Sequence, residues 1–412
     1  MAASLQTRCL IAGGGPAGMM AGYLLARAGV EVTVLEKHAD FFRDFRGDTI
    51  HPSTLELMFE LGLLEEFLKQ PHQQVSELRA VVNGQSVPIA DFTKLPTRCK
   101  FIAFMPQWDF LNFLCAQAKR FSNFQALMEH EVVDLIFDNN RVAGARARTP
   151  RGELEIRADL LIGADGRHSI VSERAGFQRL EFGVPIDVLW MRISKKPDDP
   201  RQTLGFFHHG KLLVMLDRGD YWQCGLVIPK DAFGEIKARG MRQFQDEIVG
   251  FAGFLRDRAA ELDDWSKIKL LTVQINRLRD WCREGLLCIG DSAHAMSPAG
   301  GVGINLAIQD AVATANLLAD KLRSAPVSVD DLRAVQARRE WPARLIQEMQ
   351  IFIHRRVVTG RAPPRSSASL PLVVRLLKWF PVLRQIPARF IGIGPRPEHI
   401  QNLGRSLKCD EH

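Results

Sequence analysis

Apolar positions near the N-terminus follow the pattern of a strand, then a helix, then a second strand. A continuous apolar run over residues 8–12 predicts a buried strand, and glycines follow it directly. Helical spacing covers 16–28, where a proline in the first turn is tolerated because its missing N–H has no helical partner there. A second apolar run over 30–35 completes one βαβ unit.

Helical and strand-like patterns alternate through the rest of the sequence. The helical spacings cover 54–68, 108–120, 233–260 and 304–322, and the strand patterns cover 75–104, 125–167 and 286–289. Short strands separated by turns over 182–228 predict an antiparallel sheet inserted between parts of the first domain. The remainder is predicted to be helical, with an interruption at 361–369.

A glycine-rich turn joins the first predicted strand to the first predicted helix. Gly13, Gly15 and Gly18 have the G-x-G-x-x-G spacing, with Pro16 and Ala17 between the last two. Gly13 permits a tight turn, the missing Cβ of Gly15 lets a pyrophosphate approach the backbone, and Gly18 allows close packing of helix on strand. The free N–H groups of the helix N-terminus favour phosphate binding.

An acidic residue, Glu36, ends the second predicted strand, and Lys37 follows it. A carboxylate there accepts hydrogen bonds from an adenosine ribose and repels a 2′-phosphate, so the unit fits FAD or NAD and not NADP. A glycine-rich structural turn is the alternative interpretation. The order of strand, helix, second strand and Glu36 favours dinucleotide binding.

These patterns predict an α/β protein of more than one domain, because 412 residues exceed what one compact core usually holds. We expect a Rossmann-type FAD-binding domain, an inserted antiparallel-sheet substrate domain and a C-terminal helical segment. The first domain is predicted to consist of residues 1–75, 101–180 and 280–325, the substrate domain of 76–100 and 181–279, and the C-terminal segment of 326–412.

Two further acidic motifs follow apolar strands. Asp165 stands in Gly-Ala-Asp-Gly-Arg-His-Ser over 163–169, and Asp291 stands in Gly-Asp-Ser-Ala-His over 290–294. Ligands of α/β sheets bind at the carboxyl ends of strands, so both carboxylates are candidate ligand contacts. A polar turn without function is the alternative. For His294, close to Asp291, we expect a structural hydrogen bond in preference to acid–base catalysis.

A second glycine-rich loop precedes the long helix predicted from residue 304. The loop includes Pro298, Gly300, Gly301, Gly303, Ile304 and Asn305. Such a loop can lay bare backbone against a flat ring, and the helix N-terminus then faces any negative charge that the ring acquires. A connection made flexible by glycine is the alternative.

In this order, the three motifs resemble the para-hydroxybenzoate-hydroxylase-like FAD-dependent monooxygenases, which are single-component aromatic hydroxylases. The similarity runs from about residue 8 to residue 322. It implies non-covalent FAD. Glu36 would hold the adenosine ribose, Arg46 and Gln107 would contact the cofactor, and Asp291 would bind the ribityl hydroxyls.

The resemblance also assigns roles around the ring and the reductant. Pro298 and the backbone of 300–305 would line the isoalloxazine. The Asp165 turn would serve both FAD and a transient nicotinamide cofactor, with Arg167 as a candidate phosphate contact. Ser172 stands where the family often has arginine, so the nicotinamide contact stays open.

The reaction implied by the resemblance belongs chiefly to the cofactor, and no catalytic side chain is assigned beyond the loop against the flavin. NADH or NADPH reduces the flavin, oxygen forms a flavin hydroperoxide, and one oxygen atom enters a small aromatic or polycyclic substrate by hydroxylation or epoxidation. The alternatives are a flavin-dependent reductase or dehydrogenase on the same fold, and a non-catalytic flavoprotein binding module. A halogenase is disfavoured because the segment W-x-W-x-I-P is absent from the sequence.

The inserted sheet supplies four candidate substrate contacts, Trp190, Arg192, His208 and Trp222. Strand alternation places Trp190 and Arg192 on one face, and aromatic rings with one cation suit an aromatic, acidic ligand. Membership of the core is the alternative for each aromatic residue. No metal site is predicted, because adjacent histidines at 208 and 209 point to opposite faces of a strand and no H-E-x-x-H sequence occurs.

The net charge of +7 is concentrated at the C-terminal end. Residues 338–412 contain 14 Lys/Arg and 5 Asp/Glu, which is +9 and leaves −2 for the first 337 residues. This distribution, without an RNP, zinc-finger or homeodomain motif, argues against nucleic-acid binding. Residues 370–393 mix apolar side chains with cations, which predicts either a helical cap on the protein or peripheral contact with an anionic membrane.

Seven cysteines without a Cys-x-x-Cys pair predict reduced thiols and a cytoplasmic protein. No apolar stretch reaches the length of a membrane span, and the N-terminal apolar run is predicted to be a first strand and not a signal peptide. We expect a small-molecule substrate and molecular oxygen as partners, and a monomer or a homodimer.

Overall fold

The computed structural model describes residues 3–42, 49–82, 85–200, 204–208, 211–358 and 372–401. Its first sheet has eight strands and contains the N-terminal βαβ unit. The order along its main path is β19-β20-β11-β1-β2-β8, and β10 and β9 extend it from β11. The strands are β1 (Ala3–Ala12), β2 (Val32–Glu36), β8 (Phe124–Met128), β9 (Glu131–Asp138), β10 (Arg141–Thr149), β11 (Gly152–Gly163), β19 (Cys282–Arg283) and β20 (Leu286–Cys288).

The centre of this sheet is parallel and buried. Ile11 of β1 lies between Ile162 of β11 and Val34 of β2, and all three are at most 1% exposed. Parallel strands covered on both faces are apolar throughout, which explains the continuous apolar runs in the sequence. Helix α1 (Pro16–Arg27) packs against α8 (Val302–Ser324) and α4 (Gln107–Ala118), close to the predicted bounds of all three helices.

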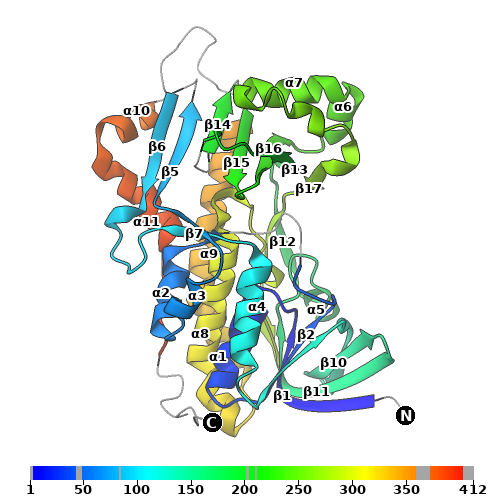
Figure 1. The fold of residues 1–412 in the computed structure, drawn as a ribbon. Coiled ribbons are helices and arrows are strands. Elements are labelled where there is room, and N and C mark those ends of the chain that lie inside the picture. The colour runs from blue at the N-terminus through cyan, green and yellow to red at the C-terminus, as the bar shows by residue number, and fades with distance from the viewer. Residues whose placement is uncertain are drawn as a thin grey trace.

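A second sheet of seven strands forms the other end of the molecule (Figure 1). Its order is β17-β13-β16-β15-β14-β5-β6. The strands are β5 (Glu77–Val82), β6 (Gln85–Asp91), β13 (Ile186–Ser194), β14 (Leu204–His208), β15 (Lys211–Asp217), β16 (Tyr221–Pro229) and β17 (Lys269–Leu271). The predicted inserted sheet is confirmed, with one difference: β14 pairs with β5 in parallel and not antiparallel, and β5 and β6 belong to an earlier part of the chain.

Smaller elements connect the two sheets. β3 (Thr49–Ile50), β7 (Ile102–Phe104) and β4 (Gln73–Val75) form one small sheet, and β12 (Arg179–Phe182) pairs with β18 (Ile275–Leu278). The predicted helix over 233–260 consists of α6 (Phe233–Ala238) and α7 (Met241–Phe251), followed by short 3-10 turns. The short helices are α5 (Ile170–Arg174), η1 (Phe92–Lys94), η2 (Gly253–Leu255), η3 (Ala259–Glu261), η4 (Trp265–Lys267), η5 (Gly290–Ser292) and η6 (Ala299–Gly301). The predicted domain limits stay a proposal. The division of the strands between the two large sheets supports it.

The prediction of a single helix over 54–68 is wrong, because two helices occupy that stretch. These are α2 (Pro52–Glu60) and α3 (Leu64–Phe67). Gly62 between them has φ +75°, and the N–H of Leu63 donates to the carbonyl of Met58 at 2.8 Å. A left-handed glycine with such a backward hydrogen bond ends a helix.

The C-terminal part is helical, as predicted. α9 (Val329–Val358) is followed by α10 (Leu372–Trp379), η7 (Pro381–Arg384) and α11 (Gln385–Gly392). The predicted interruption at 361–369 lies outside the described residues. In the described part of the chain, one helix, Ala299–Ser324, is long and apolar enough to cross a membrane, but 78% of its apolar window is buried inside the protein, so it is a core helix.

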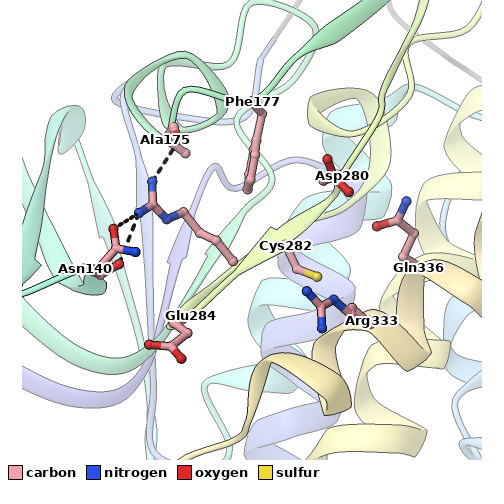
Figure 2. A pocket seen from close by; sticks show the side chains of 9 residues that line it. Asn140, Ala175, Phe177, Asp280, Cys282, Glu284, Arg333 and Gln336 are labelled. Atoms are coloured by element: carbon pink, nitrogen blue, oxygen red, sulfur yellow. Dashed lines mark hydrogen bonds between the residues drawn. The ribbon is translucent and has the colours of Figure 1, made fainter.

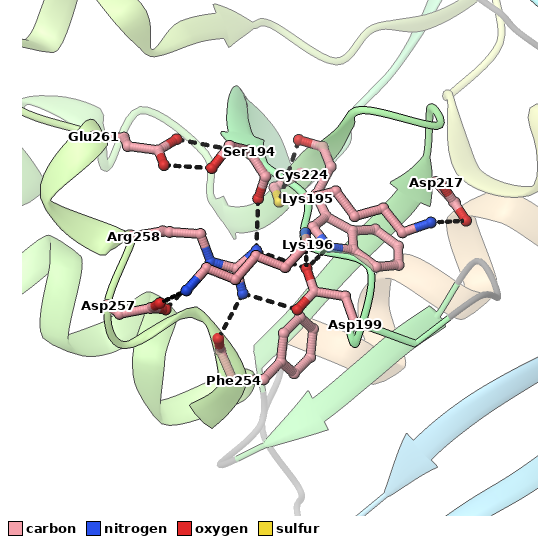
Figure 3. Close-up of polar contacts among 11 residues, drawn as sticks. Ser194, Lys195, Lys196, Asp199, Asp217, Cys224, Phe254, Asp257, Arg258 and Glu261 are labelled. Carbon is pink, nitrogen blue, oxygen red and sulfur yellow. Dashed lines mark hydrogen bonds and ion pairs between the residues drawn. The ribbon is translucent and has the colours of Figure 1, made fainter.

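A buried ion pair fixes the turn after β13 to the helical layer (Figure 3). The two terminal nitrogens of Arg258 lie 2.6 and 2.9 Å from the carboxylate of Asp199, and the indole N–H of Trp222 also donates to it at 2.9 Å. Burial opposes the charged form, but these donors lower the pKa of Asp199 to about 2. The turn after β13 is therefore joined both to Arg258, between η2 and η3, and to Trp222 of β16.

Candidate active site

The turn between β1 and α1 has the shape that a bound pyrophosphate needs. Gly13 has φ +105°, and a Cβ on it would lie 2.4 Å from the carbonyl oxygen of Ala164. A Cβ on Gly18 would lie 1.9 Å from the carbonyl oxygen of Gly13, so both positions require glycine. A Cβ on Gly15 would meet no atom within 4 Å, so open space lies beside this backbone at the start of α1, where Pro16 and Ala17 follow.

Glu36 lies at the end of β2, beside this turn. Its Oε2 accepts a hydrogen bond from the N–H of Gly14 at 3.0 Å, and its Oε1 accepts one from the N–H of His38 at 3.1 Å. Two backbone donors thus fix the carboxylate at the edge of the open space. Lys37 is exposed next to it.

The two acidic motifs meet through an ion pair. Nη2 of Arg167 lies 3.3 Å from Oδ2 of Asp291, which joins the turn after β11 to the turn after β20. Asp165 accepts a hydrogen bond from the N–H of Val171 at 3.1 Å, and burial raises the pKa of this carboxyl. Two buried atoms, Oδ1 of Asp165 and Nη1 of Arg167, have no hydrogen-bond partner among the described residues. Buried polar groups are rarely left unpaired, so these atoms and the open space at Gly15 fit a bound dinucleotide.

The other predicted cofactor contacts are less constrained. Gln107 is the first residue of α4 and is partly exposed. Arg46 lies outside the described residues. Ser172 is buried and accepts a hydrogen bond from Arg179 at 3.2 Å, so it holds the segment after the Asp165 motif together.

The loop before α8 combines left-handed glycines with an uncapped helix N-terminus. Gly300 has φ +79° and Gly301 has φ +63°, and a Cβ on Gly301 would lie 2.2 Å from Oγ1 of Thr49. Within the described helix, no side chain caps the N-terminus and the first turn, which includes Gly303 and Ile304, has no acidic residue. The helix therefore presents free N–H groups and a partial positive charge at this end.

The side chain of Asn305 holds this helix start to β3 and α2. Its Oδ1 accepts hydrogen bonds from the N–H of His51 at 3.0 Å and from Oγ1 of Thr54 at 2.7 Å. Its Nδ2 donates to the carbonyls of Thr49 and Gly301, both at 3.3 Å. The predicted contact of Asn305 with the flavin therefore rests on its backbone, because the side chain points into the protein.

Two residues of α9 hold the other side of the loop, and sequence reasoning missed both. Nε2 of Gln350 donates to the carbonyls of Ser297 and Ala299 at 3.1 and 3.0 Å, and Oε1 accepts from the N–H of Ser297. His354 lies 3.1 Å from the hydroxyl of Ser297. The loop that carries Pro298 is thus fixed to helix residues that are 53 and 57 positions further along the chain, which no local sequence pattern reports.

A buried cluster of charged side chains holds the Gly290–Asp291 turn in place. Oδ2 of Asp310 lies 2.5 Å from Nε2 of His294 and accepts the N–H of Gly290 at 3.0 Å, while Oδ1 accepts from Arg339 at 3.0 Å. Burial opposes the charge, but His294 and Arg339 keep the pKa of Asp310 below its usual value. The structural hydrogen bond expected of His294 is present, and its partner is Asp310 and not the nearby Asp291.

One face of the second sheet is left uncovered by α6 and α7. Trp190 lies on this face over Gly225, where a Cβ would come within 2.9 Å of the indole ring. Arg192, two residues further along β13, is exposed, and its guanidinium stacks 3.8 Å from the centroid of the Tyr221 ring. α9, which holds the loop before α8, also contacts β15 of this sheet. The face offers the rings of Trp190 and Tyr221 and one cation, Arg192.

The structure corrects the assignment of Trp222 to the substrate site. Trp222 is 0% exposed and packs in the core between the sheet and α7, with Met191 and Cys224. Strand alternation gives Trp190 and Trp222 opposite faces, and the sequence did not show which face the helices cover. His208 ends β14, and its side chain lies outside the described residues.

Two cavities formed by described residues lie outside the dinucleotide motifs. The first, of about 400 Å³, lies beside β19 (Figure 2), and Arg283 in its wall donates to the carbonyl of Ala175 at 3.0 Å. The second, of about 710 Å³, is lined by residues between 73 and 79, by Lys195, which follows β13, and by Asp217, which ends β15. Among the described residues, no group of three or more His, Cys, Asp or Glu side chains is arranged to hold a metal ion.

Comparisons with known proteins agree with this geometry. The family described as FAD binding domain matches residues 6–348. The 6-methylpretetramide 4-monooxygenase of Streptomyces rimosus is 31% identical over 390 residues, which are 93% of this chain and 92% of that protein. The rifampicin monooxygenase of Streptomyces venezuelae is 26% identical over 73% of this chain, which spans 62% of that longer protein.

A solved structure shares the fold over almost the whole chain. The anhydrotetracycline hydroxylase of Streptomyces rimosus superposes with a TM-score of 0.73 at 22% identity, covering 94% of this chain and 76% of that one. At this identity the likeness concerns the fold alone. The Rossmann-type domain and the inserted sheet therefore occur together in a known architecture.

Proposed function

The chain belongs to the FAD binding domain family and is an FAD-dependent monooxygenase, and from that premise we propose that it hydroxylates a polycyclic aromatic substrate that carries an acidic phenol or enol. The observation that carries the proposal is the sheet face that α6 and α7 leave uncovered, where the Trp190 ring lies close over Gly225 and Arg192 stacks on Tyr221. Flat rings suit a fused aromatic system, and a guanidinium suits an ionised oxygen. The similarity to a relative named for 6-methylpretetramide supports the same substrate class.

FAD supplies the redox chemistry when bound, through reduction by a nicotinamide cofactor and reaction with molecular oxygen. Gly15 and the N-terminus of α1 would hold its pyrophosphate, Glu36 the adenosine ribose, and Arg167 and Asp291 its central part. The loop containing Pro298 and the glycines at 300, 301 and 303 would lie against the ring. The start of α8 would stabilise negative charge there.

The chain's own contribution to the reaction is to bind and orient the substrate and to exclude water. Trp190 would fix the plane of the substrate, and Arg192 would fix its rotation within that plane. Gln350 and Asn305 hold the two sides of the loop, so its position is fixed by hydrogen bonds to the scaffold. We assign no proton transfer to a side chain at this site.

The test is oxygen-dependent turnover. Purified protein reconstituted with FAD is screened against phenolic, polyketide-like compounds for stimulated oxidation of NADH and of NADPH, and products are analysed with isotopically labelled dioxygen. We expect one labelled oxygen atom in the product for each nicotinamide consumed with a true substrate. Anaerobic reduction of a substrate without oxygen incorporation would establish the reductase alternative, and FAD binding without any turnover would establish the binding module.

We also propose the finer points of location and assembly. The protein would act in the cytoplasm, where six buried free cysteines stay reduced, as a monomer or a homodimer. Cell fractionation and light scattering test these two statements separately.

A further inference from the structure

Four apolar side chains project into solvent where α10 turns into α11. Trp379, Phe380, Val382 and Ile386 are exposed by 61, 53, 63 and 68%, and we call them the apolar tip. Isolated exposed apolar residues are common, but a group of large side chains within eight residues is not. The tip therefore needs a partner or a function.

Contacts with the rest of the protein hold the apolar tip in place and direct its side chains outward. α10 and α11 both pack against β6, and Figure 1 shows α10 on the outer side of β6, away from α6 and α7. Pro381 follows the last helical turn of α10, and Arg384 donates to the carbonyls of Leu377 and Lys378, which closes the corner between the helices. Ala388 is 0% exposed and anchors α11. The apolar side chains are thus held outward while other parts of the same segment are buried.

The charged residues along the chain on either side of the tip have a single sign. From Arg355 to Arg396 the sequence contains nine arginines and lysines and no aspartate or glutamate. Arg375 lies 4.7 Å from the centroid of the Trp379 ring, and Lys378 is exposed beside it. A symmetric contact between two copies would place this basic surface against itself, which repulsion disfavours. An anionic surface with an apolar interior is complementary to both features.

We propose that the apolar tip and its surrounding cations dock the enzyme on an anionic lipid bilayer. Trp379, Phe380, Val382 and Ile386 would insert at the level of the headgroups, and Arg375 and Lys378 would contact lipid phosphates. This contact is peripheral. The apolar helix over 299–324 takes no part in it, because it is buried in the core.

The test uses the full chain loaded with FAD and sedimentation with vesicles. Vesicles of phosphatidylcholine alone are compared with vesicles that contain phosphatidylglycerol, at low and at physiological salt. We expect at least tenfold tighter binding to the anionic vesicles at low salt, weakened by added salt. The triple variant W379S/F380S/I386S should lose binding tenfold or more, and R375Q/K378Q should lose about fivefold for each charge removed.

The matched control is W341S/F352S, which replaces two α9 residues exposed by 54 and 59% outside the tip. It should bind vesicles like the wild type. Flavin content and melting temperature show that each variant is folded, and the charge variant tests the same surface if the triple variant does not fold. Equal binding to neutral and anionic vesicles, or equal loss in the control, overturns the proposal. A wild-type dimer that the tip variant converts to a monomer, without vesicle binding, assigns the tip to a second copy.

Discussion

Arg167 and Asp291 are 124 residues apart in the chain, and their side chains form an ion pair with 3.3 Å between Nη2 and Oδ2. Each residue belongs to a different motif, and each motif follows a different strand of the first sheet. The second terminal nitrogen of Arg167 is buried without a partner among the described residues. The pair would thus close one wall of the proposed cofactor site, and it leaves one donor available for a ligand.

Replacing Arg167 with alanine should weaken FAD binding by tenfold or more, because a charge-assisted hydrogen bond contributes about 1.5–3 kcal/mol. Arg167→Lys should recover only part of this loss, since lysine keeps the charge but not the planar fork. Titration of apoprotein with FAD, followed by flavin fluorescence, measures the effect. Arg174→Ala is the control: Arg174 is half-exposed and lies 3.9 Å from Asp134. Unchanged FAD affinity in Arg167→Ala would remove Arg167 from the site.

Gly15→Val should abolish the yellow colour of the purified protein without unfolding it. The added side chain enters space that is empty in the protein alone, so the melting temperature of the apoprotein should change little. The stabilisation that FAD gives to the wild type should disappear, because the ligand can no longer occupy that space. Gly250→Ala on α7 also meets no atom within 4 Å and should keep the cofactor. A yellow Gly15→Val protein contradicts the assigned position of the pyrophosphate.

Gly225→Ala should change substrate selection while FAD stays bound. The new methyl group would lie 2.9 Å from the Trp190 ring, so the ring has to move away from the sheet. We expect a higher KM for the best substrate and a preference for smaller ones. Trp222→Phe, on the opposite face, should lower stability by about 2 kcal/mol through the lost hydrogen bond to Asp199 and leave KM unchanged. A raised KM in Trp222→Phe together with an unchanged KM in Gly225→Ala would place the substrate on the face that carries Trp222.

Asp310→Asn should destabilise the fold strongly, by about 3 kcal/mol or more, because it removes a buried carboxylate that binds Arg339, His294 and the N–H of Gly290, and leaves the buried Arg339 with Glu398 as its remaining carboxylate. Asp320→Asn on the same helix is the control, since Asp320 is 94% exposed and lies 3.8 Å from Arg323. Urea unfolding of both apoproteins gives the comparison. Similar small losses in the two variants would show that the buried cluster contributes little.

The sequence predicted the cofactor half of the site because its signals are local. Each signal reports a backbone requirement within about thirty residues. The signals are the glycines at 13, 15 and 18, the carboxylate of Glu36 and the apolar strands around them. The structure shows two of those requirements directly, as backbone contacts that a Cβ on Gly13 or Gly18 would violate.

The other features depend on contacts between distant segments. Whether Trp190 or Trp222 faces the ligand depends on which face α6 and α7 cover, and alternation alone leaves that undecided. The partner of His294 stands on α8, sixteen residues away and outside its motif. Gln350 and His354 reach the loop only because α9 returns along it. Gly62 is present in the sequence as a residue that can end a helix. The helical spacing of apolar residues on both sides of it nevertheless predicts one continuous helix.

Protonation of His51 should destabilise the protein in mildly acidic solution. Nδ1 lies 2.7 Å from the carbonyl of Ile391 and must donate to it, so the buried Nε2 carries the lone pair and has no partner among the described residues. Burial therefore lowers the pKa of His51 from 6.5 to about 4. The unfolded chain binds a proton below about pH 6.5, whereas the folded protein does so only near pH 4. Stability is thus lost as the pH falls between these values, by up to about 3 kcal/mol from this residue.

The measurement is the difference in unfolding free energy between wild-type and His51→Gln apoproteins from pH 7.5 to pH 4. The variant loses the hydrogen bond to Ile391 at every pH, but it lacks the titrating group, so its stability should fall less steeply on acidification. The wild type should approach the variant by about 1.4 kcal/mol per pH unit below pH 6.5 and then level off near pH 4. His168→Gln, which removes an exposed histidine, should run parallel to the wild type. A constant difference between wild type and His51→Gln over this range would mean that His51 takes up its proton in the folded state as readily as in the unfolded chain.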